Sequence, residues 1–279
     1  MQRSFTRFIG VDLGGARGKT TAVAELRSGP SGVEVFEVST RSVRQPWTDE
    51  TLVHRLAVES TTTVIAIDAP LTQSACNRCE RPVCPGMEAC ADPAVIWLRS
   101  EGRSLVRKVA AETVNGNGAR PTHTLTAQAR LAPYTHRATE VIMTYERGLL
   151  PLSSLGGANG SIAARAGQLR RRLRGVGYEL HANLLEVSAA ATISALCGSR
   201  AARGYKRDAD PWRTRAVVLE RLGDLSFAAQ SRMAREDVLQ NDHCFDAVIA
   251  GYTAYLWARD GWATPGGCFT EDGWITAPP

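Results

Sequence analysis

The sequence contains few aromatic residues, little lysine and no long apolar run. Aromatic residues make up 6% of the 279 positions, and only 3 of the 33 basic residues are lysine. No apolar run approaches the roughly 20 residues of a membrane helix, so we expect no membrane as a partner. The N-terminal residues MQRSFTRFIG also lack the apolar stretch and cleavage site of a signal peptide. These absences predict a cytoplasmic protein.

The remaining composition is that of a folded domain. Hydrophobic residues make up 44% of the chain and charged residues 22%, which excludes collagen, coiled-coil rods and wholesale disorder. The length suits one large α/β domain, which we expect to span 1–279. The net charge of +5 comes from arginine, a residue suited to bidentate phosphate contacts. Compositional bias explains that excess better, so the charge permits a nucleic-acid partner without showing one.

The hydrophobic pattern predicts alternating strands and helices. Three short apolar runs joined by glycine-rich turns are typical of an antiparallel meander, and two later runs read as buried strands. The strands are expected at 7–13, 20–26, 33–40, 63–68 and 178–187. The helices are expected at 48–59, 94–115, 161–174, 210–222 and 242–258, the first with Thr48 as its N-cap.

This order of elements is that of a ribonuclease H-like α/β fold. A meander of three strands followed by a crossover helix and a parallel strand predicts a mixed five-stranded sheet, in which parallel strands extend the antiparallel ones. Residues 72–155 interrupt the order. We expect them to form a cysteine-rich, mostly helical insertion within the single domain.

Acidic residues end several of the predicted strands. Asp12 lies in IGVDLG, Asp68 ends IAIDAP and Glu186 ends LLEVSA. A lone carboxylate in an apolar run is costly to bury unless it is paired or binds a cation. Strands that end at one edge of a sheet bring such groups together. The last predicted helix adds Asp242 and Asp246, one turn apart, with His243 beside them.

Clustered carboxylates repel one another unless a cation neutralises them. Oxygen ligands suit Mg²⁺ or Mn²⁺, and two such ions activate a water and steady the leaving oxygen of a phosphodiester. For a single acid, a local helix or loop cap is the simpler interpretation. The set as a whole favours a metal site for phosphodiester hydrolysis.

Several segments resemble a known family. IGVDLGG, IAIDAPL, PYTHRATEV, LLEVSAA, YKRD and DHCFDAVIAGYTA look like the DUF429 family of predicted nucleases with a ribonuclease H-like fold, over about residues 7–276. HCFDAVIAGYTA also resembles the last helix of RuvC-type Holliday-junction resolvases. The resemblance implies a metal-dependent nuclease that acts on DNA or RNA. Since such resolvases often work in dimers, the choice between a monomer and a homodimer stays open.

Roles for individual residues follow from the convergence of the acids together with the resemblance. Asp12 would bridge two ions, with Asp68, Glu186 and Asp246 completing their ligand sets. Lys206 would stabilise the charged phosphate. The implied peripheral and substrate-binding residues are Asp242, His243, Arg137, Glu140 and Arg215. A surface ion pair is the competing interpretation for Arg137 with Glu140 and for the basic segment that contains Lys206 and Arg215.

The first glycine-rich turn does not match a P-loop, because GARGKTT has Leu13 at the position of the first P-loop glycine. Two other functions remain as alternatives to the nuclease. Actin-like and sugar-kinase ATPases hold phosphates on their first hairpin, and Asp12, Gly14, Lys19 and Thr20 fit that pattern. The chain is short for the two copies of the core that such ATPases use. A non-catalytic protein that binds nucleic acid is the third hypothesis.

Four of the seven cysteines fall within one short segment: Cys76, Cys79, Cys84 and Cys90. Four thiolates so close together can enclose one tetrahedral zinc ion, and short Cys spacings with Cys-Pro also occur in [4Fe–4S] proteins. We favour zinc over the cluster. The loop begins eight residues after Asp68, so its arginines are expected near the acidic edge.

Overall fold

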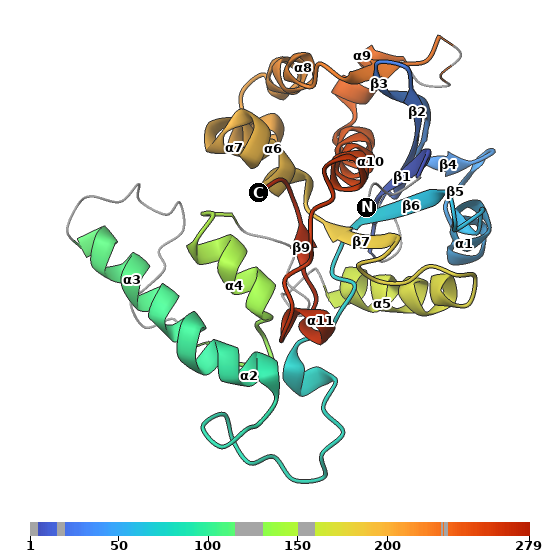
Figure 1. The fold of residues 1–279 in the computed structure, drawn as a ribbon. Coiled ribbons are helices and arrows are strands. Elements are labelled where there is room, and N and C mark those ends of the chain that lie inside the picture. The colour runs from blue at the N-terminus through green and yellow to red at the C-terminus, as the bar shows by residue number, and fades with distance from the viewer. Residues whose placement is uncertain (1–4, 16–19, 115–130, 150–159, 230, 232–233) are drawn as a thin grey trace.

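A mixed sheet of seven strands runs through the computed structural model, in the order β8-β3-β2-β1-β6-β7-β9 (Figure 1). The structure describes residues 5–15, 20–114, 131–149, 160–229, 231 and 234–279. The strands are β1 Arg7–Asp12, β2 Ala22–Gly29, β3 Gly32–Ser39, β6 Thr63–Asp68, β7 Leu184–Val187, β8 Leu225–Phe227 and β9 Ile275–Thr276. A separate two-stranded sheet pairs β4 Arg41–Ser42 with β5 Gln45–Pro46.

The predicted antiparallel meander is confirmed. β2 is antiparallel to both β1 and β3, whereas β6 is parallel to β1 and β7 is parallel to β6. The register of β1 and β6 pairs Asp12 with Asp68. Since the two strands are parallel, both acids lie at the same edge of the sheet.

The prediction of five strands is wrong, because short strands extend both edges of the sheet. β8 and β9 have three and two residues, too few for a period-2 pattern to reveal them. The strand expected at 178–187 begins only at Leu184. Ahead of it, the carbonyl of Glu179 accepts the N–H groups of Ala182, Asn183 and Leu184, which closes a turn.

Helices cover both faces of the sheet (Figure 1). One face carries α1 Asp49–Leu56 and α5 Gly160–Arg174, whose apolar residues pack on Ile9 and Val11. The other face carries α6 Ala189–Cys197, α7 Ser199–Arg207, α8 Pro211–Arg221, α9 Arg235–Gln240 and α10 Asp242–Asp260. Thr48 caps α1 as predicted, and its hydroxyl accepts the Thr51 N–H. The sequence pattern missed α6, α7 and α9.

Two glycines bring α10 directly onto β1. A Cβ atom at Gly10 would lie 1.9 Å from the Ala247 carbonyl oxygen and 2.3 Å from the Gly251 nitrogen. A Cβ atom at Gly251 would lie 2.6 Å from the side chain of Leu26. Only residues without a side chain allow this approach. It places the first turns of α10 beside the end of β1.

The described part of 72–155 contains short helices that lie to one side of the sheet (Figure 1). They are a 3₁₀ turn at Ala75–Asn77, α2 Pro93–Trp97, a π-helical segment Leu98–Gly102, α3 Arg103–Val114 and α4 Ala138–Tyr145. The helix expected at 94–115 is thus interrupted by π geometry, and α4 was not among the individual helices expected. The C-terminal α11 Phe269–Asp272 packs on this part through Phe269 and Trp97.

Candidate metal centre

Three carboxylates from three separate elements meet at one edge of the sheet. Asp12 ends β1, Asp68 ends β6 and Asp246 lies in the second turn of α10. One oxygen from each lies within 4.8 Å of the other two. The parallel register of β1 with β6 places Asp12 beside Asp68. The close approach of Gly10 to Gly251 places Asp246 next to them. We call this group the carboxylate triad.

The most buried member of the triad has only one of its oxygens satisfied. Asp246 is 1% exposed, and Lys206 of α7 forms an ion pair with its Oδ2 atom. Its Oδ1 atom is buried and has no hydrogen-bond partner in the described part of the chain. Asp68 receives one hydrogen bond, from the Ala189 N–H at the start of α6, at 3.1 Å. A buried carboxylate oxygen without a partner is costly, and a cation bound to that oxygen would offset the cost.

Burial and mutual repulsion raise the pKa values of two carboxylates in the triad. Burial, Asp246 and Asp12 raise the pKa of Asp68 to about 8. Burial also raises the pKa of Asp246 to about 7, with Asp12 adding to the shift and Lys206 opposing it. Such shifts arise when like charges crowd a desolvated site. A bound cation would remove the repulsion that causes them.

Two basic side chains flank the triad on its solvent side. The His243 Nδ1 atom lies 2.6 Å from Asp12 Oδ2, and this contact raises the pKa of His243. Burial alone would lower the pKa of Lys206, but Asp246 raises it above its ordinary value. Lys206 and His243 are 40% and 41% exposed, so the triad opens to solvent between them.

The donor set fits a divalent cation. Three carboxylates face one lysine and one histidine, and among the described residues the Oδ1 atom of Asp246 has no hydrogen-bond partner. Hard oxygen donors of this kind bind Mg²⁺ or Mn²⁺. The structure therefore brings together three of the predicted ligands, with Lys206 and His243 beside them.

Glu186 is not brought into this group. It is 2% exposed, and its two oxygens accept hydrogen bonds from Arg137 at 2.8 and 2.7 Å. The Leu71 N–H donates to the same carboxylate at 2.8 Å. The guanidinium of Arg137 neutralises the charge of Glu186. Glu186 thus anchors the loop that follows Asp68.

The predicted substrate-binding residues are also engaged within the chain. Arg137 is 0% exposed and binds Glu140 and Thr72 as well as Glu186. Arg215 is 4% exposed, and it donates to the carbonyl oxygens of Tyr205 and Leu239. These arginines are buried and join elements of the fold.

A family match covers most of the chain and all three carboxylates. The family model described as "Protein of unknown function (DUF429)" matches residues 10–267. The chain belongs to the DUF429 family. No curated protein and no solved structure matches it. None of the described helices is long and apolar enough to cross a membrane.

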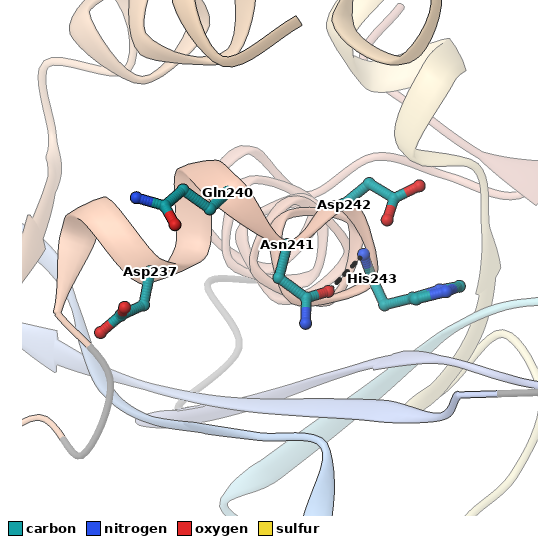
Figure 2. Close-up of a pocket in the computed structure, with 5 residues that line it drawn as sticks. All are labelled: Asp237, Gln240, Asn241, Asp242 and His243. Carbon is teal, nitrogen blue, oxygen red and sulfur yellow. Dashed lines mark hydrogen bonds between the residues drawn. The ribbon is translucent and has the colours of Figure 1, made fainter.

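In this DUF429 chain, a cavity of about 450 Å³ lies at the junction of α9 and α10, beside the triad. Its lining is polar: Asp237, Gln240, Asn241, Asp242 and His243 (Figure 2). The Asn241 side chain caps α10 by accepting the His243 N–H at 3.1 Å. Asp242 lines this cavity and is not part of the triad. His243 lines the cavity and also contacts Asp12 of the triad.

The four clustered cysteines of the DUF429 chain are free thiols in one loop. Burial raises the pKa of Cys76, and electrostatic repulsion from Cys84, Cys90 and Cys79 raises it further. The four thiols are therefore close enough to interact electrostatically. Among the described residues, no three sulfur atoms come as close together as the triad oxygens do. Two arginines in or near this loop form ion pairs within the chain: Arg78 pairs with Asp272, and Arg103 at the start of α3 pairs with Glu88.

The sequence pattern missed a backbone group that contacts the triad. The Ala189 N–H fixes Asp68, and it is presented by the N-terminus of α6, which Ser188 caps. The signal was a serine directly after an apolar strand, followed by small helix-forming residues.

Proposed function

We propose that this chain is a divalent-metal-dependent nuclease that hydrolyses phosphodiester bonds in nucleic acid. The observation that carries the proposal is the carboxylate triad, whose oxygens from β1, β6 and α10 lie within 4.8 Å of one another. Carboxylates from separate elements converge in this way where a cation compensates their charge. The unpartnered Asp246 Oδ1 atom supports the same conclusion.

The strand order supports a ribonuclease H-like core. Strands β3, β2 and β1 form the meander, and β6 and β7 extend it in parallel, which is the order expected for that fold. The acids at the ends of β1 and β6 lie where open α/β sheets place their ligands. Under this proposal, β8 and β9 are additions at the edges.

The residues around the triad take distinct roles. Mg²⁺ or Mn²⁺ held by Asp12, Asp68 and Asp246 would supply an activated water and stabilise the leaving oxygen. His243 holds the Asp12 carboxylate in place through its 2.6 Å contact. Lys206 is placed to hold a phosphate oxygen, because its ammonium is partly exposed beside the triad. Glu186 and Arg137 position the loop after Asp68.

The proposal is tested by a cleavage screen in Mg²⁺ and in Mn²⁺ against single-stranded, duplex and branched DNA and RNA. We expect cleavage by the wild type and none by Asp12→Asn or Asp246→Asn. The control is Asp237→Asn, which removes an exposed carboxylate on α9 and should cleave as the wild type does. Cleavage that survives both triad substitutions refutes the mechanism. Binding of nucleic acid without any cleavage favours a non-catalytic binding protein.

ATP hydrolysis is measured in the same screen, because the ATPase hypothesis uses Asp12, Gly14, Lys19 and Thr20. Lys19 lies outside the described residues, and Thr20 is the first residue described after that gap. Turnover of ATP that the triad variants abolish, without cleavage of nucleic acid, would replace the nuclease proposal.

We further propose that the four-cysteine loop binds zinc, with a [4Fe–4S] cluster as the competing occupant. The support is the spacing of Cys76, Cys79, Cys84 and Cys90 and the mutual influence of their thiols. Among the described residues no three of these sulfur atoms lie as close together as the triad oxygens do, so binding of one ion by all four would require the loop to close around the metal.

A further inference from the structure

The helix that carries Lys206 has an exposed face made of basic residues. In α7, Ala202, Gly204 and Tyr205 are buried, and the exposed positions include Arg200, Arg203, Lys206 and Arg207. At about 100° per residue, these four side chains fall within an arc of roughly 120°. No apolar residue is exposed on α7. We call these four residues the α7 basic face.

Three of these charges are not neutralised by the described part of the chain. Arg200, Arg203 and Arg207 form no ion pair there, whereas Lys206 contacts Asp246. The nearest carboxylates along the chain have other partners: Asp208 accepts from the Thr214 hydroxyl, and Asp210 caps α8.

Other basic groups of the chain are partly neutralised. In the region 72–155, Arg78 and Arg103 have carboxylate partners, and Arg99 donates to backbone carbonyls. On α5, Arg172 and Arg174 face Glu50 and Glu179. The α7 basic face thus combines unneutralised charge with direct contact to the triad, through Lys206.

The spacing of the face suits consecutive phosphates. The rise from Arg200 to Lys206 is about 9 Å along the helix axis. A strand of B-form nucleic acid carries one phosphate about every 3.4 Å along its axis, so this distance spans two to three phosphates. Arginine also binds phosphate oxygens in a bidentate manner. Lys206, in the last turn of α7, connects this face to the triad through its ion pair with Asp246.

We propose that the α7 basic face binds the phosphates on one side of the bond to be cleaved, so that the substrate is a polynucleotide and not a mononucleotide or a small phosphate ester. This inference rests on the proposed nuclease function for its link to cleavage. An anionic membrane fits the face less well, because membrane-surface helices carry exposed apolar residues beside their basic ones.

The test is the salt dependence of binding to a fluorescein-labelled single-stranded 20-mer, measured by anisotropy in EDTA so that no turnover occurs. The variant is R200Q/R203Q/R207Q, and R171Q/R172Q/R174Q on α5 is the control with the same change in charge. Each lost phosphate contact should reduce the slope of log K against log salt by about 0.7. We expect a reduction of about 2 for the α7 variant, a loss of affinity of at least about tenfold at 0.1 M salt, and a much smaller effect for the control.

Two results overturn the inference: an α7 variant that binds as the wild type does, and a control variant that loses as much as the α7 variant. Thermal melting by circular dichroism establishes that both variants fold. An anionic vesicle of phosphatidylserine and phosphatidylcholine serves as a second probe, and tighter binding to it than to the 20-mer also contradicts the inference.

A cleavage measurement separates this inference from the nuclease proposal. For the α7 variant, the ratio of kcat/KM on the 20-mer to kcat/KM on a dinucleotide should fall by about tenfold or more. If the wild type cleaves nothing but binding still depends on α7, the nuclease proposal fails and the binding face stands. If the wild type cleaves and the α7 variant retains the full ratio, the binding face fails and the nuclease proposal stands.

Discussion

Replacing Asp68 with asparagine should change how the stability of the metal-free protein depends on pH. The pKa of Asp68 is about 8 in the folded protein, against an ordinary value of 3.8. Because the folded state holds this proton more tightly than the unfolded state, Asp68 contributes stability at low pH. That contribution is lost as pH rises toward 8.

The magnitude follows from the shift. One pKa unit corresponds to about 1.4 kcal/mol, and from pH 6 to pH 9 the folded state releases close to one proton that the unfolded state has already lost, which for a pKa of about 8 amounts to about 2.7 kcal/mol. Asp68 titrates together with Asp246 and is partly exposed. Its contribution to the free energy of unfolding should therefore change by a smaller amount, about 2 kcal/mol, over this pH range. The asparagine variant has no such proton, and its free energy of unfolding should fall by about 2 kcal/mol less between pH 6 and pH 9.

The assay is urea unfolding in EDTA at pH 6, 7, 8 and 9, followed by circular dichroism, for the wild type, Asp68→Asn and the control Asp237→Asn. The difference between wild type and Asp68→Asn cancels the titration of groups that both proteins share. Added Mg²⁺ should stabilise the wild type more at pH 8 than at pH 6, because the ligands must be deprotonated. A wild type and an Asp68→Asn variant with parallel pH profiles would refute the reasoning.

Three further predictions concern the parts that support the site. Gly10→Ala should lower both the free energy of unfolding and the Mn²⁺ affinity, because its Cβ would lie 1.9 Å from the Ala247 carbonyl oxygen; calorimetric affinity equal to that of the wild type would contradict this. Arg137→Met should cost about 3–5 kcal/mol in urea unfolding, because it leaves the Glu186 charge buried and unpaired. Adding Glu186→Gln should restore much of the lost free energy of unfolding. A double variant no more stable than Arg137→Met would show that the unpaired Glu186 charge is not the cause of the loss. The wild type purified without oxygen should be colourless and contain one equivalent of zinc, and Cys76→Ser should contain less; a brown protein with four irons would favour the cluster, and the absence of both metals would reject the site.

The sequence predicted the part of the site that depends on parallel strands. Asp12 and Asp68 each end an apolar run, and parallel pairing necessarily brings such residues to one edge of the sheet. Asp246 was found from its place near the start of a long helix. Its contact with β1 depends on Gly10 and Gly251, whose close approach no periodicity reveals.

The same strand-end pattern did not reveal that Glu186 pairs with Arg137. An acid at the end of a strand gives the same sequence pattern whether it binds a metal or pairs with an arginine. Arg137 lies 49 residues away, in a stretch for which no individual helix or strand was expected. The edge strands β8 and β9 were missed for a related reason, since pairing partners distant in the sequence define them and their own residues do not.

The most direct test of the metal centre is the anomalous difference density of a crystal grown with Mn²⁺. The account predicts a peak among Asp12, Asp68 and Asp246, with carboxylate oxygens at about 2.0–2.6 Å from it. It also predicts that the peak disappears in Asp246→Asn. A well-ordered crystal saturated with Mn²⁺ that shows no peak there, with Lys206 still paired to Asp246, would contradict the central claim.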